Sequence, residues 1–317
     1  MKKILAIVLA AVMLLSMTAC GAAAKKDTYV VGICQLVQHD ALDAATKGFQ
    51  DALTEALGDK VEFEVQNASG DSVNCTTIIN GFVSSKVDLI MANATPALQA
   101  AASATSEIPI LGTSVTDYAF ALEIDGWTGT VGGNISGTSD LAPLDQQAAM
   151  IQELFPDAKN IGLLYCSAEA NSQYQVDEMT KYLTELGLTA TAFAFTDTND
   201  VASVAQAACD ASDVLYIPTD NTAASNTEAI ANVVLPAKVP VIAGEAGICE
   251  GCGIATLSIS YYDLGVATGK MAAKILTGEA DISTMPIEFT TATPKYNASM
   301  CETLGITPLE GYTAIAE

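Results

Sequence analysis

Short apolar runs alternate with amphipathic stretches from residue 29 onward. Runs of this length are typical of buried strands in parallel sheets, where helices cover both faces. Residues 41–57 carry apolar side chains at helical spacing, and Gly58 follows as a stop signal. The alternation predicts α/β architecture. The expected strands are at residues 29–34, 61–66, 89–92 and 109–111 in one half of the chain, and at 161–165, 191–195, 214–217 and 241–243 in the other.

Three segments of the first half recur with similar sequence in the second half. The matched pairs are 29–34 with 160–165, 88–91 with 213–216, and 108–112 with 239–243. Two similar halves predict two similar parallel-sheet lobes, joined by a multi-strand hinge and facing a shared cleft. Clefts between domains are common binding sites for small molecules.

Polar, glycine-rich stretches predict where the chain crosses between the lobes. We expect crossings at residues 127–139, 244–253 and 286–294, with the strand at 254–259 and the helix at 264–276 returning to the first lobe. The predicted first lobe is residues 28–137 plus 254–287, and the second is 138–253 plus 288–317.

The N-terminus predicts a targeting segment rather than part of the fold. Two lysines precede an apolar run at residues 4–17, which is too short for an ordinary membrane span. Small residues then precede Cys20, which is similar to the lipobox of bacterial lipoproteins. We expect a signal peptide at residues 1–19, a lipid on Cys20 and a tether at 20–27, which would anchor the protein outside the cytoplasm. The alternative is a plain secretory signal cut near Ala19.

The charge balance narrows the classes of partner. The formal net charge is −24, and all thirteen basic residues are lysines. Such a surface repels nucleic acid and anionic membranes, so neither is an expected partner. Without arginine, bidentate guanidinium binding of a carboxylate is excluded. Lysine, hydroxyl groups, backbone N–H groups or helix N-termini must hold any anion.

The cysteines leave several possibilities open. Seven remain beyond Cys20, so at least one is free or pairs between molecules. Cys249 and Cys252 form a C-x-x-C motif, which fits free thiols, a local disulfide, a redox pair or half of a metal site. We expect no metal, because a zinc site needs two more ligands and the only histidine, His39, is distant in sequence. No cofactor is expected.

Ligands of open parallel sheets bind beyond the carboxyl ends of the strands, and the repeat allows these ends to be compared between the halves. The first half places His39, Thr95 and Ser114 at positions where the second half has carboxylates. The corresponding residues of the second half are Glu169, Asp220 and Glu245.

This asymmetry favours a ligand with one carboxylate and one ammonium. Thr95 and Ser114 are expected near helix N-termini, which favour an anion, whereas Asp220 and Glu245 can accept hydrogen bonds from an ammonium. A free α-amino acid fits this description. A purely structural role is also open, because Thr95, Asp220 and the adjacent Asn221 are good helix-capping residues.

Six motifs, in order, support a resemblance to a known family. They are QLVQHDALD (35–43), ATPA (94–97), NISGTSD (134–140), YCSAEANS (165–172), IPTDNT (217–222) and ATLSISYYDLG (255–265). The chain resembles the ABC-transporter substrate-binding lipoproteins of the TrpX type, which have the type I periplasmic-binding-protein fold. Two departures are Asp40 after His39, where proline is usual, and the cysteine pair 249/252.

The resemblance implies capture of a small solute, in several members an aromatic amino acid, and its delivery to a permease driven by a separate ATPase. We therefore expect a monomeric, non-catalytic receptor. The motifs add five residues to the predicted cleft, although the last four can also cap helices. These are Gln35, Ser139, Asp140, Asn171 and Ser172.

Three other functions remain open. A duplicated α/β fold also suits sugars, and a sensory subunit would present its ligand to a receptor instead of a transporter. A surface hydrolase would use His39 with Asp43 and a serine, but the G-x-S-x-G nucleophile motif is absent.

Overall fold

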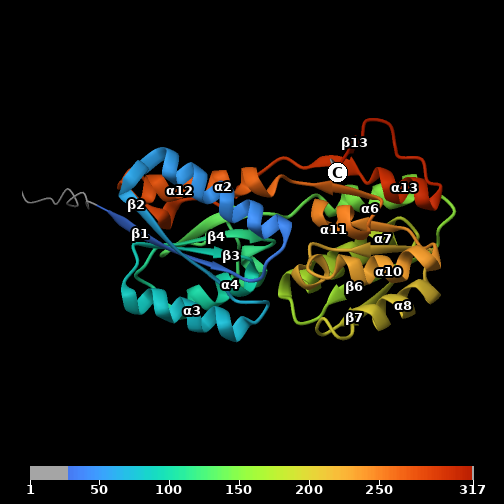
Figure 1. Cartoon of the computed structure of the whole chain (residues 1–317), viewed down its shortest axis with the longest axis horizontal. Coiled ribbons are helices and arrows are strands. Elements are labelled where there is room, and N and C mark those ends of the chain that lie inside the picture. Colours follow the sequence, from blue (N-terminus) through green and yellow to red (C-terminus); the bar gives the residue numbers. More distant parts are fainter. Residues whose placement is uncertain (1–27, 316–317) are drawn as a thin grey trace, which may run out of the picture.

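The computed structural model describes residues 28–315 and contains two sheets, arranged one after the other along the long axis (Figure 1). The predicted signal peptide, Cys20 and the whole of the predicted tether lie outside the described residues. Within residues 28–315, no helix has both the length and the apolarity that a membrane span requires.

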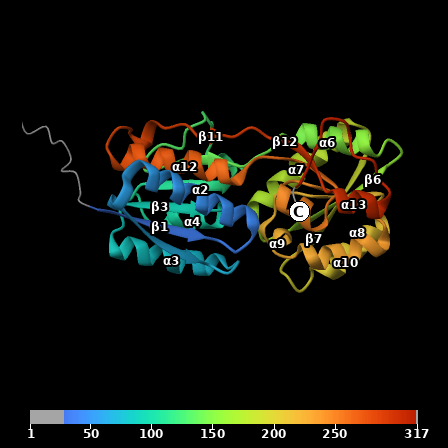
Figure 2. The ribbon, with the colours of Figure 1, turned by 45° about the horizontal axis from the view of Figure 1, so that its top comes forward.

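The first sheet has six parallel strands in the order β11-β5-β4-β3-β1-β2. The strands are β1 (Tyr29–Gln35), β2 (Val61–Asn67), β3 (Leu89–Asn93), β4 (Ile110–Val115), β5 (Ile135–Ser139) and β11 (Glu288–Phe289). One face is covered by α2 (Asp40–Leu57) and α12 (Tyr261–Leu276), the other by α3 (Ser72–Ser85) and α4 (Thr95–Ala104) (Figures 1 and 2). Short helices complete the lobe: η1 (Gly58–Lys60), α5 (Tyr118–Ala121) and η2 (Ile282–Thr284).

The second sheet has seven strands in the order β13-β12-β10-β9-β8-β6-β7, parallel except for the β10–β12 pair. Its strands are β6 (Asn160–Cys166), β7 (Thr189–Phe195), β8 (Val214–Ile217), β9 (Val241–Ala243), β10 (Ala255–Ser258), β12 (Thr293–Tyr296) and β13 (Thr313–Ala314). One core contains residues of α6 (Leu144–Leu154), α7 (Ala170–Glu185) and α13 (Ala298–Leu304). The opposite core contains residues of α8 (Val201–Ala211), α10 (Thr227–Ala237) and α11 (Ala246–Cys252), and α9 (Asn221–Ala224) follows β8.

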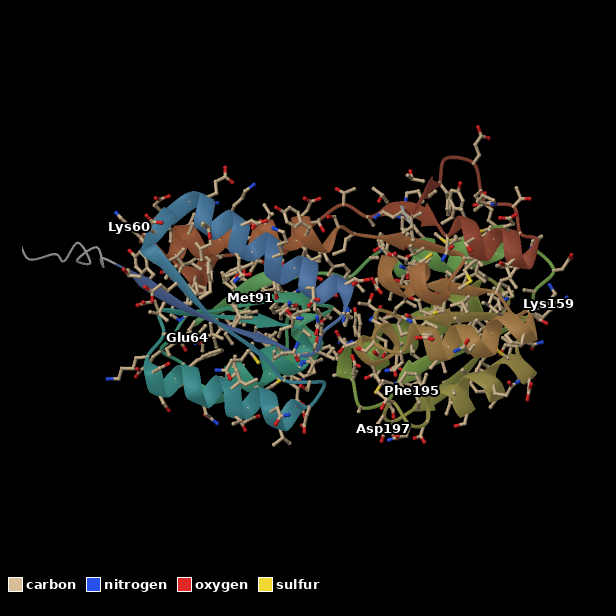
Figure 3. The ribbon with its side chains drawn as sticks, viewed as in Figure 1. Lys60, Glu64, Met91, Lys159, Phe195 and Asp197 are labelled. Carbon is tan, nitrogen blue, oxygen red and sulfur yellow. The ribbon has the colours of Figure 1, made fainter. Side chains whose placement is uncertain are left out.

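All eight strands expected from the apolar runs are present, and the two-lobe α/β prediction is confirmed. Figure 3 shows Met91 of β3 inside the first lobe, whereas Lys60 and Glu64 lie at its outer edge. Met91 has no exposed surface, because helices pack on both faces of its sheet. Burial on both faces explains why the central strands are continuous apolar runs.

The internal repeat has the same structural role in both lobes. The Asp88 carboxylate accepts a hydrogen bond from the backbone N–H of Val30 (2.9 Å), at the start of β1. The Asp213 carboxylate accepts hydrogen bonds from the backbone N–H groups of Lys159 (2.9 Å) and Asn160 (2.8 Å), at the start of β6. The recurring aspartate therefore ties the first strand of each lobe to the loop before its neighbour.

The chain passes between the sheets three times, but two of the predicted crossings are wrong. Residues 127–139 do not all cross, because β5 pairs with β4 in the first sheet. Residues 244–253 form α11 of the second lobe, and β10, expected in the first lobe, pairs with β9 in the second. The passages follow β5 and β10, and the third lies between β11 and β12, inside the predicted 286–294 segment. The predicted boundaries at 137/138, 253/254 and 287/288 are displaced accordingly.

Helices α2 and α12 approach each other closely, because glycines lie at their contact. A Cβ atom added to Gly48 would be 2.1 Å from the carbonyl oxygen of Tyr262, and one added to Gly265 would be 2.0 Å from that of Ala45. Any larger side chain at either position would push the helices apart. The N-terminal end of α12, which follows the second crossing, is thereby held firmly against α2.

Candidate functional site

The cleft between the lobes contains two hollows at the carboxyl ends of the strands. The inner chamber is narrow in this closed form, with a cavity volume of about 10 Å³, and its lining includes His39, Ser114, Asp140, Asn171, Asp220 and Glu245.

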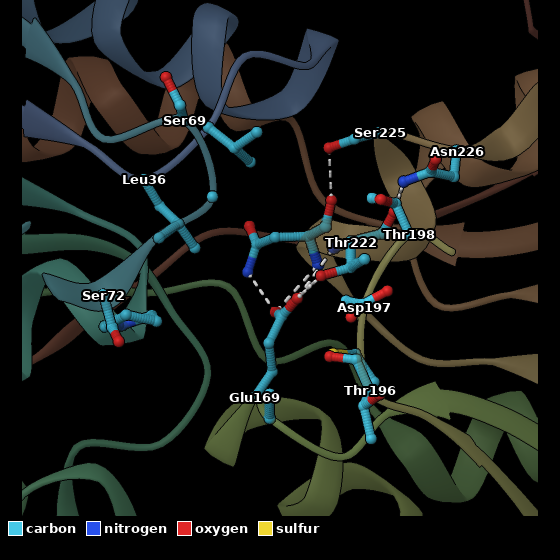
Figure 4. Close-up of a pocket in the computed structure, with 16 residues that line it drawn as sticks. Leu36, Ser69, Ser72, Glu169, Thr196, Asp197, Thr198, Thr222, Ser225 and Asn226 are labelled. Atoms are coloured by element: carbon cyan, nitrogen blue, oxygen red, sulfur yellow. Dashed lines mark hydrogen bonds between the residues drawn. The ribbon is translucent and has the colours of Figure 1, made fainter. Parts of the chain in front are cut away.

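The outer chamber has a cavity volume of about 320 Å³ and is drawn in Figure 4. Leu36 and Pro96 line it from the first lobe, and Glu169, Asp197 and Thr222 line it from the second. Asn221 lines both chambers, so the two hollows are neighbours.

The structure brings most of the twelve predicted site residues to these hollows. Seven line the inner chamber, namely His39, Ser114, Asp140, Asn171, Asp220, Asn221 and Glu245. Glu169 lines the outer chamber. The other four are buried close to the strand ends but line neither chamber; they are Gln35, Thr95, Ser139 and Ser172.

Three of the predicted residues carry buried polar atoms without a hydrogen-bond partner: Thr95 Oγ1, Ser114 Oγ and Asn171 Oδ1. Thr95 comes just after β3 and Ser114 is the second-last residue of β4; because Asn93 pairs with Thr113, the two hydroxyl-bearing residues lie at adjacent strand ends. Leaving a buried polar atom unpaired costs free energy, so these three atoms are available to form hydrogen bonds with a ligand.

Thr95 does not cap its helix as predicted. Ala94 occupies the N-cap position of α4 with a φ of 93°, and Thr95 is the first helical residue. Ser114 also has a positive φ, 53°. Ala94 and Ser114 therefore both adopt a backbone conformation that favours glycine. A strained backbone at two adjacent strand ends is a feature that clusters at ligand sites.

Asp220 caps a helix, as the structural alternative predicted. Its side chain accepts hydrogen bonds from the backbone N–H of Ala223 (2.8 Å), at the start of α9, and from that of Cys166 (2.6 Å). Burial raises the pKa of Asp220 to about 7, and the nearby Glu169 carboxylate adds to the increase. The carboxylate therefore has backbone donors but lacks a cationic partner that would restore its ordinary pKa.

Glu245, which follows the neighbouring strand β9, also caps a helix with a buried carboxylate. It caps α11 by accepting hydrogen bonds from the backbone N–H groups of Gly247 (2.7 Å) and Ile248 (2.5 Å). Burial raises its pKa, and the nearby His39 opposes that increase. Asp220 and Glu245 are both almost fully buried, with 1% and 3% of their surfaces exposed.

Asp140 lies in the first crossing, where it adds a third carboxylate to the inner chamber. It accepts hydrogen bonds from the hydroxyls of Thr116 (3.1 Å) and Tyr261 (2.9 Å). Burial raises its pKa to about 6 despite these bonds. The alternative that Ser139 and Asp140 cap α6 is wrong, because Pro143 occupies that position.

The Glu169 carboxylate accepts hydrogen bonds from residues of its own lobe, the second. As Figure 4 shows, it accepts hydrogen bonds from the side chains of Asn221 (2.6 Å) and Thr222 (2.7 Å), and both backbone N–H groups also donate to it. Asn171 donates to Glu169 as well (3.2 Å). Glu169, and not Asn171 or Ser172, is the N-cap residue of α7, so the capping alternative for those two is wrong.

Gln35 and Ser139 also make their hydrogen bonds within the protein. The Gln35 amide donates to Asp43 (2.6 Å) and accepts from Thr46 (2.7 Å), and the Ser139 hydroxyl donates to the carbonyl of Thr116 (2.8 Å). These contacts hold the strand ends in place on the first-lobe side of the cleft.

Thr116, Thr219 and Tyr261 line the inner chamber but were not among the predicted site residues. Thr219 lies in the loop after β8, Tyr261 begins α12 after the loop that follows β10, and Thr116 comes just after β4. The rule that ligands bind at carboxyl ends would have found all three, had it been applied to β10 and to every residue after β4 and β8.

Contacts across the cleft show that the lobes are closed. His39 Nε2 lies 3.2 Å from the Asn221 side-chain oxygen, which joins the first lobe to the second. Away from the chambers, the rings of Phe120 and Tyr174 pack with their centroids 5.4 Å apart. Few contacts of this kind would survive in an open form.

The seven cysteines among the described residues are free and buried, so the C-x-x-C pair is not a disulfide. Cys252 Sγ contacts the carbonyl oxygen of Ile248, and burial raises the pKa of Cys249, which disfavours a reactive thiolate. Within residues 28–315, no group of three or more histidine, cysteine or acidic side chains is placed to hold a metal ion.

Comparison with known proteins places this geometry in a family. A tyrosine-binding protein of Clostridioides difficile is 37% identical over 253 residues, which are 79% of this chain and 73% of the relative. Among solved structures, the ABC domain in complex with L-Trp from Streptococcus pneumonia is 34% identical, with a TM-score of 0.86 over 91% of this chain and all of that one.

A further structure is the ligand-free, open form of a substrate-binding protein with adhesive properties from Clostridium difficile. It is 36% identical and covers 91% of this chain and 99% of its own length, yet its TM-score is only 0.69. The lower score at similar identity agrees with the closed lobes described above.

A leucine-binding protein from Thermotoga maritima shares the fold at 16% identity, with a TM-score of 0.60 over 80% of this chain and 84% of its own. The two-lobed architecture is that of type I periplasmic binding proteins, as expected. The family model of ABC transporter substrate binding proteins matches residues 30–316. The chain therefore belongs to the family of ABC transporter substrate-binding proteins.

Proposed function

We propose that this protein is a receptor for an aromatic amino acid, which it binds between the lobes, among the residues of the inner and outer chambers, and delivers to an ABC importer. The observation that carries the proposal is the pairing, in one closed hollow, of unpartnered polar atoms and three carboxylates whose one basic neighbour in the lining is His39. Such a site is incomplete without a ligand that supplies hydrogen-bond donors and positive charge.

The ammonium of the ligand would lie toward the second lobe, where Asp220 and Glu245 offer carboxylate oxygens and Asn171 offers an unpartnered amide oxygen. The ligand carboxylate would lie toward Thr95 and Ser114, near the N-terminus of α4. This orientation is the one expected from the asymmetry of the strand ends, and it requires no arginine.

An aromatic side chain is supported by the relatives, of which one is a tyrosine-binding protein and another was solved with L-Trp. Within this chain, Tyr261, Leu42 and the ring of His39 line the inner chamber and offer surfaces for an aromatic ring. The outer chamber gives a large side chain further room.

Binding would act by lobe closure. The ligand contacts both lobes only when they are closed, so it shifts the open–closed equilibrium by its differential affinity for the closed form. We infer that a permease with a separate ATPase recognises that form. We also infer that the protein is a monomer held outside the cytoplasm by a lipid on Cys20.

A catalytic role is not supported by the surroundings of the only histidine. His39 contacts Asn221, whereas Asp43, the acidic partner of the hypothetical triad, accepts a hydrogen bond from Gln35. We therefore infer a receptor that releases its ligand unchanged.

A ligand screen tests the proposal. The purified protein is heated with each of the twenty amino acids and with common sugars, and hits are titrated by calorimetry, because a true ligand raises the melting temperature by mass action. We expect tyrosine or tryptophan to give the largest shift. A sugar that stabilises the protein while aromatic amino acids leave it unchanged would refute the proposal.

A further inference from the structure

The side chain of His39 reaches across the cleft, because its own helix does not use it. His39 is the N-cap residue of α2, and its backbone carbonyl accepts the first helical hydrogen bond from Asp43 (3.0 Å). N-cap side chains commonly bond to N–H groups of the first turn, but the imidazole of His39 makes no such bond. Its Nε2 atom lies instead 3.2 Å from Asn221 Oδ1 in the second lobe.

The other hydrogen bonds of Asn221 settle which atom of this pair donates. The side-chain nitrogen of Asn221 donates to Glu169 Oε2 (2.6 Å), and its backbone N–H donates to the same oxygen (3.0 Å). An ionised carboxylate only accepts, so the amide nitrogen must face Glu169 and the amide oxygen must face His39. Nε2 of His39 therefore carries a proton, which it donates across the cleft to Asn221.

Both ends of this hydrogen bond are held in place by the fold. In the second lobe, Asn221 is only 9% exposed, and Glu169, which fixes its amide, is the N-cap residue of α7. In the first lobe, His39 begins α2, which packs closely against α12 at Gly48. Groups that are already ordered lose little entropy when they bond, so this contact can hold two moving lobes together effectively.

The imidazole is also part of the wall of the inner chamber. His39, Ala224 and Glu245 line both the inner chamber and a further hollow of about 330 Å³ in the cleft, which the exposed Asp40 and Glu250 also line. The ring therefore lies at the boundary between the two hollows. Moving it away would open the inner chamber on this side.

We propose that His39 is a latch, a positioning residue whose Nε2–H group bonds to Asn221 in the closed form and slows the release of the ligand. The inference rests on the proposed function for the identity of the ligand, and it assigns His39 a role that needs no contact with that ligand. A single neutral hydrogen bond changes an equilibrium by roughly 2- to 12-fold. We therefore expect a moderate effect, confined to the dissociation rate.

The first test is stopped-flow kinetics with L-tyrosine and L-tryptophan at pH 8. His39→Ala should raise the dissociation rate constant at least threefold and change the association rate constant less than twofold. Glutamine is long enough to bring an amide N–H to the position of Nε2, whereas asparagine is too short. His39→Gln should therefore stay within twofold of the native dissociation rate constant, and His39→Asn should resemble His39→Ala.

The control is Gln38→Ala, because Gln38 precedes His39, is exposed and lines the 330 Å³ hollow but neither chamber. It should leave both rate constants unchanged. A His39→Ala dissociation rate constant less than threefold above the native value overturns the latch. Equal dissociation rate constants for the glutamine and asparagine variants overturn it as well.

A double-mutant cycle separates the latch from direct contact between His39 and the ligand. If His39 acts through Asn221, then adding His39→Ala to the Asn221→Ala protein should change the dissociation rate constant less than twofold. Effects of the two substitutions that simply multiply would mean that the imidazole acts on the ligand itself. That result would refute the latch and leave the proposed function intact.

The sequence contains one histidine, so nitrogen NMR of the histidine-labelled protein gives an unambiguous signal. With ligand bound, Nε2 should carry a proton that exchanges slowly with water, and Asn221→Ala should abolish that protection. An unprotonated Nε2, or equal protection in the variant, overturns the latch. If neither amino acid binds, the proposed function fails, and the latch is judged by the same spectral comparison in the ligand-free protein.

Discussion

At the scale of single residues, Asp220 combines two roles that sequence reasoning had treated as alternatives. It caps α9 and it lines the inner chamber, so the backbone donors that stabilise the helix also fix the carboxylate in the cleft. Capping and ligand binding are compatible because a carboxylate has more lone pairs than the two hydrogen bonds to the backbone use.

The first prediction follows from these two roles. Asp220→Ala should weaken binding of the aromatic amino acid at least tenfold, and loss of the cap should cost about 1 kcal/mol of unfolding free energy. Calorimetry and urea denaturation measure the two effects separately. Asp281→Ala, which removes a cap outside both chambers, should leave the affinity unchanged. Equal affinities in the Asp220 variant and the native protein would exclude Asp220 from the site.

The second prediction concerns pH. Because the folded-state pKa of Asp140 is raised to about 6 and that of Asp220 to about 7, the ligand-free folded protein binds more protons than the unfolded chain between about pH 4 and 7. These groups therefore make the free energy of unfolding fall as the pH rises through that window. Acidification from pH 8 to 5 should restore on the order of 1–3 kcal/mol per group.

Ligand binding should show the opposite dependence, because an ammonium favours the ionised carboxylates. The affinity should fall as the pH is lowered from 8 to 5, with protons released on binding at pH 6. Asp140→Asn should reduce both effects, as measured by urea denaturation and by calorimetry in two buffers of different ionisation enthalpy. A variant with unchanged pH profiles would show that Asp140 is not one of the titrating groups.

The sequence could identify most of the residues at the cleft, because strand ends are readable from short apolar runs and the repeat aligned them. It could not show what each polar group does there. The Glu169 oxygens, for example, accept from Asn221 and Thr222 on a helix 52 residues further along. Such pairings depend on how α7 and α9 pack, which no local pattern encodes.

At the scale of elements, the main error of the sequence-based prediction was to place β5 in a crossing between the lobes. Its sequence, Ile-Ser-Gly-Thr-Ser, has the composition of a loop, yet it is an inner strand of the first sheet. The hydroxyl of Thr138 makes buried hydrogen bonds with those of Thr113 and Thr268, and Ser136 donates to the carbonyl of Met285. Tertiary partners satisfy the polar groups, so burial does not require apolar side chains here.

The third prediction tests the close contact of α2 and α12. Gly48→Ala should lower the free energy of unfolding by about 1–3 kcal/mol, because its methyl group would collide with the backbone of α12. Gly81→Ala is the matched control in α3, where nothing lies within 4 Å of an added Cβ. That control should be neutral or stabilising by up to about 1 kcal/mol, since alanine favours helix. Equal urea midpoints for the two variants would contradict the tight packing.

At the scale of the whole molecule, closure depends on contacts outside the ligand site as well as within it. Phe120 on α5 and Tyr174 on α7 pack across the cleft and line neither chamber. An aromatic pair of this kind contributes about 0.5–1.5 kcal/mol beyond the area it buries. The pair therefore helps to set the balance between the open and closed forms.

The fourth prediction is that Phe120→Ala weakens ligand binding by about 2- to 12-fold without touching the ligand, because closure becomes less favourable. Calorimetry gives the affinity, and small-angle scattering of the ligand-free protein should show a larger average size. Phe289→Ala, at an exposed position on β11, is the control and should change neither quantity. A Phe120 variant with native affinity and size would show that the ring pair does not contribute to lobe closure.

The three passages of the chain between the sheets also govern the order in which the protein can assemble during export. The helical layer of α2 and α12 on the first lobe stays incomplete until α12 has emerged, more than 120 residues after β5. The second lobe then requires β12 and β13 from the C-terminal end. Neither lobe is therefore complete while the chain is still emerging, and a protease acting early would find one face of the first sheet covered by α2 alone.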